Sequence, residues 1–566
     1  MSEERLTETS QLVRKSSDGN DVGQHPTQSL QAKQTVTGTN RTSKQHWFFV
    51  DWVGSSVCIF GTLLAATTAV MIRTVLRGNA ATSGQSFFWG ASTSAYQVEG
   101  AAGGGGRRAS IWDTWCAESA AHCNGTSGEV ACDHFHRWRE DVQLMRDLGL
   151  TAYRFSISWS RVLPDGKASR VNDEGIKFYS DLIDALLEYD IEPFVTLYHW
   201  DLPQALQDEY GGWSNKTVVS DFGDYARVMF DHFSDKVRYW VTVNEAWTTS
   251  IHGYEEASNA PGFWGKDLGG SGQPYLVGHH QLLAHARAVE IYRSEGHSTA
   301  CQRGKGQIGI ANSGDFRFPL DPASASDKVA ASRAIEFQLG WFTDPVFLGA
   351  YPKSMREILG DRLPQFSEAE TKLLLGSSDF LGLNHYSSAM ASEPRQPLAF
   401  GGYWGIQQVK ISEDPSWESK TEMGWSVVPE GAIELLKWID KRYNHPAIYV
   451  TENGMAAHEP GVFLASPFLS AGSHCYCPDL SHSVEDSARS EYIRGYVRSF
   501  LEARREGVDL RGYFYWSLID NFEWQYGYSK RFGLVHIDYE TLERTPKSSW
   551  YVYRDIIESD GDVLFR

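Results

Sequence analysis

The amino-acid sequence predicts an α/β protein whose main part, residues 87–560, is a single (β/α)8 TIM barrel. Three observations predict this fold. Eight short, mostly apolar runs rich in β-forming residues recur along the chain, helical patterns lie between them, and polar side chains collect where the runs end. Strands joined by crossover helices pair in parallel, and apolar strands of this kind are buried on both faces. Eight such units close into a barrel with the helices outside.

The predicted elements follow one another in chain order. The strands are residues 87–92, 152–158, 192–200, 239–245, 307–313, 380–386, 447–454 and 510–518. The clearest helical patterns are residues 135–149, 178–190 and 487–504. An open, doubly wound sheet is the competing fold, but it would place a glycine-rich phosphate turn after its first strand. The glycine-rich stretches at 103–106 and 304–309 do not have that context, so we interpret both as turns.

Charge and composition restrict the function. The 566 residues include 52 Lys and Arg against 71 Asp and Glu, and the net charge of −19 argues against a nucleic-acid partner. Seven Cys are too few for a disulfide scaffold in a chain of this length. The 20 Trp, 26 Tyr and 28 Phe are an aromatic excess that the fold has to place. The composition indicates a large, acidic, well-packed protein.

The N-terminal part differs from the barrel sequence. Residues 1–46 contain no Phe, Tyr or Trp and are rich in polar residues, so we predict a disordered tail. Residues 52–72 carry no charge and, at about 1.5 Å per residue, are long enough for one transmembrane signal-anchor helix. A processed signal peptide or a buried core helix is the alternative, but a long polar segment precedes the run, which is unlike a cleaved signal.

Sequons and basic residues bear on the orientation of this predicted single-pass membrane protein. The glycosylation sequons at Asn124 and Asn215 follow the span and favour a lumenal or extracellular barrel, hence a glycoprotein. The sequon at Asn40 precedes the span and argues the other way. Basic residues flank the span on both sides and lean only slightly towards a cytoplasmic N-terminus.

Polar side chains stand at the ends of nearly all the predicted strands. In a (β/α)8 barrel these ends meet at one mouth, where active sites lie. A single polar residue at a strand end is most often a turn or capping residue, but several coinciding ends indicate a site. The residues concerned are Gln97, Arg154, His199, Asn244, Glu245, Asn384, Tyr386, Glu452 and Trp516.

Two of these residues, Glu245 and Glu452, are carboxylates that could act on a glycosidic bond. Breaking an acetal needs a proton for the leaving oxygen and a negative charge near the carbon that becomes cationic. Two carboxyl groups close together shift each other's pKa values apart, so that one stays protonated while the other is ionised. The aromatic excess fits this chemistry because sugar faces pack against Trp and Tyr rings.

Several motifs carry a family resemblance. The sequence resembles family 1 of the glycoside hydrolases, the β-glucosidase family, over about residues 87–560. The motifs are FFWGASTSAYQVEGA (87–101), SIWDTW (110–115), YRFSISWSR (153–161), LYHWDLP (197–203), GLNHYS (382–387), IYVTENGMA (448–456) and YFYWSLIDNFEW (513–524). The resemblance implies a (β/α)8 barrel that hydrolyses β-glycosides with retention of configuration, without a metal or an organic cofactor.

The resemblance also implies roles for individual residues. Glu452 corresponds to the nucleophile and Glu245 to the acid/base residue, while Arg154 and Tyr386 correspond to contacts of the nucleophile. The positions that correspond to substrate-binding residues are Gln97, His199, Asn244, Asn384, Trp516, Glu523 and Trp524. Ala246 stands where the family usually has Pro, a change that could loosen Glu245 because proline restricts the residue before it.

Other functions remain as alternatives. A transglycosidase would use the same covalent intermediate, and a klotho-like binding barrel would lack one or both catalytic Glu residues, which are both present here. Thioglucosidases of the family have Gln at the position of Glu245, and a carboxylate at position 523 would repel a sugar 6-phosphate. The group Cys132, His134 and His136 resembles a metal site, but it coincides with a structural motif of the family, so we predict no metal. Hydrolysis of a neutral small-molecule or oligosaccharide β-glycoside is the preferred interpretation.

Overall fold

The computed structural model describes residues 87–262, 273–398, 401–457 and 484–566. The predicted tail at 1–46 and the predicted transmembrane segment at 52–72 lie outside these residues. Within the described ranges, no helix combines the length and the apolar character that crossing a membrane requires.

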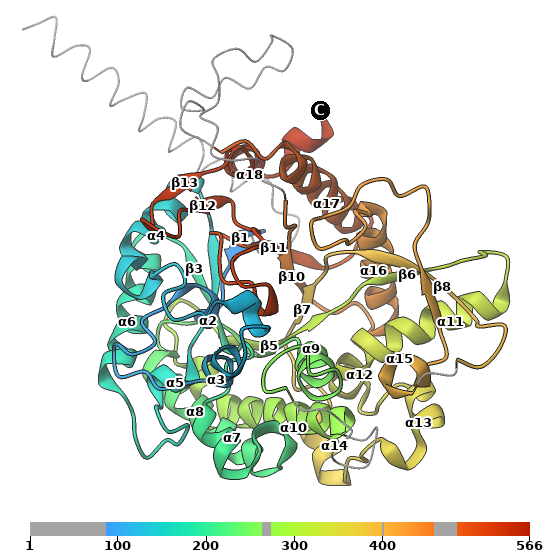
Figure 1. The fold of residues 1–566 in the computed structure, drawn as a ribbon, viewed down its shortest axis with the longest axis horizontal. Coiled ribbons are helices and arrows are strands. Elements are labelled where there is room, and N and C mark those ends of the chain that lie inside the picture. Colours follow the sequence, from blue (N-terminus) through green and yellow to red (C-terminus); the bar gives the residue numbers. More distant parts are fainter. Residues whose placement is uncertain (1–86, 263–272, 399–400, 458–483) are drawn as a thin grey trace, which may run out of the picture. The chain divides into compact units, whose positions relative to one another are not determined.

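Eight parallel strands close into the predicted barrel, with helices around it (Figure 1). The strands are β1 (Phe88–Ser92), β2 (Ala152–Ser156), β3 (Glu192–Tyr198), β4 (Tyr239–Asn244), β5 (Gln307–Ser313), β7 (Leu381–Asn384), β10 (Ile448–Asn453) and β11 (Leu510–Trp516). They pair in chain order, and β11 pairs with β1 to close the barrel. Each begins within one residue of its predicted start. Several end up to two residues earlier than predicted.

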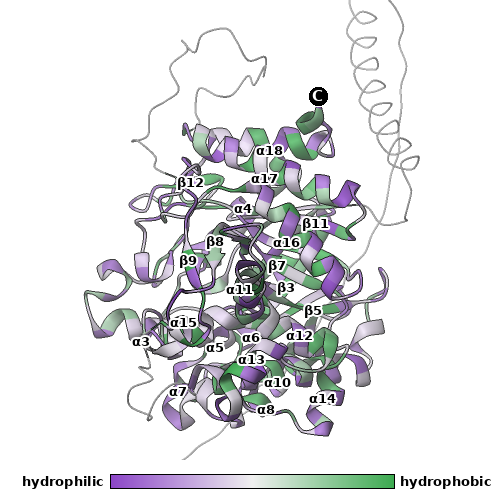
Figure 2. Ribbon diagram, turned by 90° about the vertical axis from the view of Figure 1, so that its right-hand side faces the viewer, coloured by the Kyte–Doolittle hydropathy of each residue, from purple (hydrophilic) through white to green (hydrophobic). Residues whose placement is uncertain are grey.

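The longer helices form the outer layer. They are α4 (His134–Leu148), α6 (Asp173–Glu188), α8 (Thr217–Phe233), α10 (Gln273–Ser294), α16 (Pro429–Arg442), α17 (Ser487–Arg505) and α18 (Ser548–Glu558). The helix α6 begins five residues before its predicted start, because its first turn carries Asp173 and Glu174 rather than apolar residues. Acidic residues stabilise this end of a helix. In Figure 2, α17 and α18 alternate between hydrophobic and hydrophilic residues, as expected for helices with one face against the barrel.

Two small sheets were not predicted. One contains β6 (Phe316–Pro319), β8 (Ser388–Ser392) and β9 (Lys410–Ser412), and the other contains β12 (Val535–Ile537) and β13 (Arg544–Pro546). Strands of three to five residues outside the barrel carry too little periodicity to be recognised from sequence.

Aromatic side chains fill the inside of the barrel. A buried cluster draws residues from all the barrel strands or their first flanking positions: Phe88, Ala152, Phe194, Tyr239, Val241, Ala311, Phe380, Tyr449 and Phe514. The Phe194 and Tyr239 rings stack with centroids 4.3 Å apart. Part of the aromatic excess of the sequence therefore lies inside the barrel. These side chains fill the interior below the mouth, so the barrel is a packed core and not a channel.

Two cysteines near the first strand are paired. Cys116, in α3 (Ile111–Glu118), forms a disulfide with Cys123, in the short helix η1 (His122–Gly125). Cys132 and Cys301 are free and buried. The sequence alone does not indicate which of Cys116, Cys123 and Cys132 pair with one another.

Candidate active site

The strand ends bring the predicted polar residues to one mouth of the barrel. Arg154 lies in β2, Asn244 ends β4, Asn384 ends β7 and Glu452 lies near the end of β10. Glu452 is the direct neighbour of Asn384 in the pairing of β10 with β7. The mouth is formed because parallel strands end at the same edge of the barrel.

The Glu452 carboxylate is held by two side chains. Arg154 Nη1 donates to Oε1 at 2.5 Å, and Tyr386 Oη donates to Oε2 at 2.7 Å. Burial raises the pKa of Glu452 above the usual range of a glutamate, while the Arg154 cation and these hydrogen bonds act in the opposite direction. The ion pair is almost fully buried, with side-chain exposures of 1% and 4%. The arrangement fixes the direction of both carboxylate oxygens.

Glu245 is held by different partners. It follows β4 with φ of 50°, an uncommon left-handed conformation for a residue with a side chain, and caps the short helix α9 (Ala246–Thr248). Thr248 Oγ1 donates to its Oε2 at 2.6 Å, and Asn384 Nδ2 donates to its Oε1 at 2.8 Å. Glu245 is therefore fixed at both oxygens although Ala246 replaces the usual proline.

The protonation of Glu245 differs from that of an ordinary glutamate. Burial, together with repulsion from Glu452, raises the pKa of Glu245 to about 7, although Thr248 and Asn384 oppose this rise. A carboxyl group with this pKa keeps its proton through mildly acidic pH. Such a group is suited to donating a proton to a leaving oxygen.

A hydrogen-bond network connects the two carboxyl groups. Asn244 Oδ1 accepts from Arg154 Nη2 at 2.6 Å and from Asn384 Nδ2 at 3.0 Å. Asn384 in turn contacts Glu245, and Arg154 contacts Glu452. The network places Glu245 and Glu452 in one neighbourhood although 207 positions separate them in the sequence.

The network also includes residues that the sequence analysis missed. Thr451 Oγ1 donates to Asn384 Oδ1 at 2.6 Å and so fixes the orientation of that amide. Thr248 binds Glu245 from one helical turn away. The three-residue spacing was the available signal for Thr248, whereas nothing in the sequence marks Thr451.

Aromatic rings form another wall of the site. His199 lies nearly parallel to Trp516, with centroids 5.6 Å apart, and to Trp524, at 6.1 Å. His199 Nε2 contacts Asn244 Nδ2 at 3.1 Å. Burial lowers the pKa of His199 well below its usual value, and the nearby Arg154 cation adds to this effect. A neutral imidazole can accept from the Asn244 amide at Nε2 while its other nitrogen carries the proton.

Trp200 is a further aromatic residue that the sequence analysis did not single out. Its Nε1 donates to the Asn244 carbonyl at 3.1 Å, and its ring lies 4.6 Å from that of Trp524. Trp200 has a left-handed φ of 75°. Its position directly after His199 was the available signal.

Glu523 lies in the loop that follows β11, and Gln97 contacts this loop. Gln97 Nε2 donates to the Phe522 carbonyl at 2.9 Å and approaches Glu523 Oε2 at 3.4 Å. Burial and repulsion from Glu452 and Glu245 raise the pKa of Glu523 to about 8. The carboxyl group of Glu523 is therefore close enough to Glu245 and Glu452 to be repelled by both, and Arg154 is paired with Glu452.

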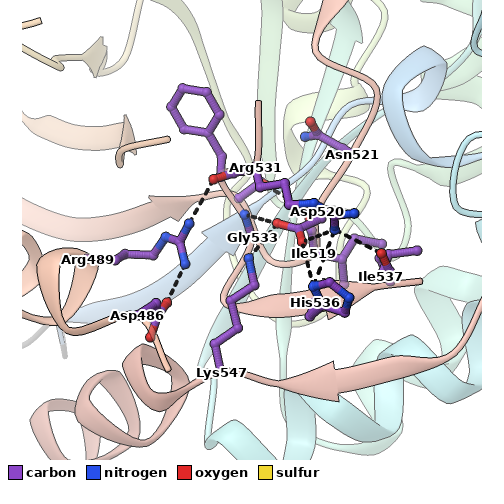
Figure 3. A network of polar contacts seen from close by, with 12 residues as sticks. Asp486, Arg489, Ile519, Asp520, Asn521, Arg531, Gly533, His536, Ile537 and Lys547 are labelled. Carbon is purple, nitrogen blue, oxygen red and sulfur yellow. Dashed lines mark hydrogen bonds and ion pairs between the residues drawn. The ribbon is translucent and has the colours of Figure 1, made fainter. Parts of the chain in front are cut away.

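A buried ion network supports the base of the Glu523 loop (Figure 3). Asp520 accepts from Lys547 Nζ at 2.7 Å, from Arg531 Nη1 at 2.8 Å and from the Gly533 amide at 2.9 Å. Arg489, which pairs with Asp486, also donates to the Arg531 carbonyl at 2.7 Å. Asp520 and Lys547 have no exposed side-chain surface, so the loop that carries Glu523 starts from a fixed point.

The predicted absence of a metal site concerns Cys132, His134 and His136. His134 Nδ1 is paired with Asp141 at 2.7 Å, and Cys132 Sγ donates to the Asp520 carbonyl at 2.9 Å. His136 is exposed and contacts Asp133. Among the described residues, no group of three or more His, Cys, Asp or Glu side chains is arranged to hold a metal ion. These residues act as packing and pairing groups around the start of α4.

The mouth of this (β/α)8 barrel holds two buried carboxyl groups, one of them ion-paired with Arg154 and the other with its pKa raised to about 7. Most glycoside hydrolases use a pair of carboxyl groups at the bond that they cleave. The family model of glycosyl hydrolase family 1 matches residues 80–562. The chain belongs to this family, and it is a glycoside hydrolase.

Named relatives agree with this membership. β-Glucosidase 42 of Arabidopsis thaliana is 45% identical over 483 residues, which cover 84% of this chain and 94% of the relative. Raucaffricine-O-β-D-glucosidase of Rauvolfia serpentina is 42% identical over 503 residues, which cover 82% and 88%. The predicted activity, that of a retaining hydrolase of the β-glucosidase type, is thereby confirmed at the level of the family.

Solved structures agree as well. A mutant of a rice β-glucosidase in a covalent complex with glucose superposes with a TM-score of 0.75 at 40% identity, covering 83% of this chain and 98% of that one. β-Glucosidase 2 of Trichoderma reesei, in complex with Tris, gives a TM-score of 0.76 at 41% identity, covering 84% and 98%. The predicted barrel is therefore confirmed.

Proposed function

We propose that this protein hydrolyses terminal, non-phosphorylated β-D-glucosyl or closely related residues, with Glu452 as nucleophile and Glu245 as acid/base residue. The observation that carries the proposal is the asymmetry of the pair. Arg154 and Tyr386 hold both oxygens of Glu452, and burial and repulsion raise the pKa of Glu245 to about 7. A retaining mechanism needs one ionised and one protonated carboxyl group in this relation.

In the first step, Glu245 donates its proton to the glycosidic oxygen while Glu452 attacks the anomeric carbon. The bond to the leaving group breaks and a glycosyl ester forms on Glu452. The loss of negative charge at Glu452 removes the repulsion that raises the pKa of Glu245. Glu245 then ionises more readily and becomes the base for the next step.

In the second step, Glu245 takes a proton from the incoming water, and the water oxygen attacks the anomeric carbon. The ester bond breaks, and Glu452 leaves as a carboxylate that Arg154 and Tyr386 again accept into their hydrogen bonds. Two inversions at one carbon give net retention. An acceptor alcohol in place of water would give transglycosylation through the same intermediate.

The polar residues of the opposite wall are proposed to select the sugar. Gln97, His199 and Asn244 offer amide and imidazole groups, and the Trp516 ring provides a surface for the sugar face. Glu523 and Trp524 are proposed to contact further hydroxyl groups. A phosphate dianion here would be repelled by the Glu452 carboxylate and, whenever it is ionised, by Glu523, so a neutral sugar is favoured.

A substrate comparison tests this proposal. We expect the purified protein to release nitrophenol from the nitrophenyl β-glucoside, with β-galactoside and β-fucoside as graded alternatives, and to leave the β-glucoside 6-phosphate intact. The Glu452→Gln variant, which lacks the proposed nucleophile, is the negative control. No release from any neutral β-glycoside would contradict the proposed function, and a preference for the 6-phosphate would contradict the neutral sugar.

We also propose that residues 52–72 anchor the protein in a membrane with the barrel on the lumenal or extracellular side. The disulfide between Cys116 and Cys123 supports an oxidising compartment. The sequon residues Asn124 and Asn215 are exposed. Asn215 Oδ1 accepts hydrogen bonds from the Thr217 amide and hydroxyl at 3.0 and 2.9 Å. A glycan is attached through the side-chain nitrogen, which these two bonds do not use.

Expression of the full chain in a eukaryotic secretory host tests the anchor and the orientation together. We expect the protein to stay with membranes in alkaline carbonate, and enzymatic removal of N-glycans to lower its apparent mass. The variant Asn124→Gln/Asn215→Gln should show no such mass change. Release from the membranes would contradict the anchor, and an unmodified wild-type chain would contradict the lumenal barrel.

A further inference from the structure

The segment that carries Glu523 and Trp524 forms a tight turn. The Glu523 amide donates to the Gly527 carbonyl at 2.6 Å, and the Gly527 amide donates to the Trp524 carbonyl at 3.0 Å. Gly527 has φ of 55° and ψ of −128°, a conformation that residues with a side chain rarely adopt. The position of Glu523 and Trp524 therefore depends on what Gly527 packs against.

Gly527 packs against the loop at residues 122–128, which contains Cys123 of the disulfide. A Cβ atom at position 527 would lie 2.2 Å from Thr126 Oγ1 and 2.6 Å from the Cys123 carbonyl oxygen, so the two backbones are in direct contact. Thr126 Oγ1 itself donates to the Cys123 carbonyl at 2.7 Å. The next residue of the turn adds a hydrogen bond, since Tyr528 Oη donates to the Ser127 carbonyl at 2.7 Å.

Cys116, the other cysteine of the disulfide, lies in α3, and α3 also contacts Trp524. Trp112 and Cys116 lie one helical turn apart in α3, and the Trp112 ring lies 4.6 Å from the Trp524 ring. The Trp115 ring of α3 also stacks on His122 of the loop at 122–128, with centroids 3.4 Å apart. The disulfide thus joins the helix that touches Trp524 to the loop that touches Gly527.

From these contacts we infer that the Cys116–Cys123 disulfide is a positioning element for the sugar-binding turn at residues 523–528. It joins the two supports of the turn, α3 and the loop at 122–128, and so restricts their separation. The inference rests on the proposed function, which assigns Glu523 and Trp524 to sugar hydroxyl groups. A binding residue keeps its geometry only when the groups that support it are themselves fixed.

The consequence is measurable in binding rather than in chemistry. Without the disulfide, the turn samples positions in which Glu523 and Trp524 no longer meet the sugar, and binding is lost equally in the ground and transition states. Such a loss raises KM and leaves kcat nearly unchanged. For the double variant Cys116→Ser/Cys123→Ser we expect KM for the nitrophenyl β-glucoside to rise about fivefold and kcat to change by less than about twofold.

The control is Cys301→Ser, because Cys301 is buried and unpaired and its Sγ contacts the Lys236 carbonyl, far along the chain from the turn. It should keep the wild-type KM. If the double serine variant does not fold, Cys116→Ala/Cys123→Ala decides, since it removes the same disulfide without placing a hydroxyl group at the two buried positions. KM should then rise in the same direction.

The outcomes separate this inference from the proposed function. A wild-type KM in the folded double serine variant, or in the double alanine variant when that one decides, overturns the positioning role while the glucosidase activity stands. A fall in kcat at constant KM also overturns it. No activity of the wild-type protein on neutral β-glycosides is instead a failure of the proposed function.

Discussion

Glu452→Gln is expected to lower kcat/KM by at least about 10⁴-fold, because the amide cannot form the glycosyl ester. The fold should survive the change. The new amide oxygen can accept from Arg154 and the amide nitrogen can donate to Tyr386, so the two buried partners keep hydrogen bonds. Steady-state kinetics on the nitrophenyl β-glucoside and the melting temperature measure the two effects separately.

Glu192→Gln is the matched control for this variant. Glu192 is also a buried, ion-paired glutamate in a barrel strand, but it begins β3 at the opposite end of the barrel and pairs with Arg238 and Arg303. It should lose stability and keep activity. Turnover of Glu452→Gln near the wild-type rate would show that another group is the nucleophile.

Glu245→Ala is expected to lose turnover of glycosides with poor leaving groups, because these need the proton that Glu245 donates. Substrates with activated aryl leaving groups should lose much less in the first step. Azide should then restore turnover and give the β-glycosyl azide, since a small anion can attack the glycosyl ester without a base. Product analysis and kcat with and without azide measure this rescue.

The pH dependence provides an independent check on Glu245. The first step needs Glu245 protonated, and its pKa is raised to about 7, so wild-type activity should fall as the pH rises through about 7. It should also fall at low pH, where Glu452 takes up a proton, and burial moves that limb above the usual glutamate range. The alkaline limb should disappear in Glu245→Ala. An unchanged alkaline limb together with no azide effect would assign the acid/base role elsewhere.

Much of the fold was predictable because its signals are local. Each barrel strand is a short apolar run buried on both faces, and nearly every such run ends in polar residues that have to meet at the mouth. The start of α6 was placed too late because its first turn, with Asp173 and Glu174, interacts through charge rather than burial. The short strands of the two small sheets depend on neighbours that are distant in the sequence.

The site was predictable as a set of residues but not as a network. The strand-end positions and the family resemblance identify Glu245 and Glu452, whereas the orientation of Asn384 by Thr451 and the support of Glu245 by Thr248 follow only from three-dimensional contacts. The same holds for the contact between Gly527 and the loop at residues 122–128. Pairing across hundreds of residues has no signature in a single sequence.

The central claim is that Glu452 and Glu245 act on opposite sides of one anomeric carbon through a covalent intermediate. Incubation with a 2-deoxy-2-fluoro-β-glucoside that has a good leaving group tests it most directly, because the fluorine slows breakdown of the intermediate. Mass spectrometry of the intact protein and of its peptides should find one added fluoroglucosyl group, attached to Glu452. Attachment to any other residue, or turnover of natural glycosides with inversion of configuration, would contradict the account.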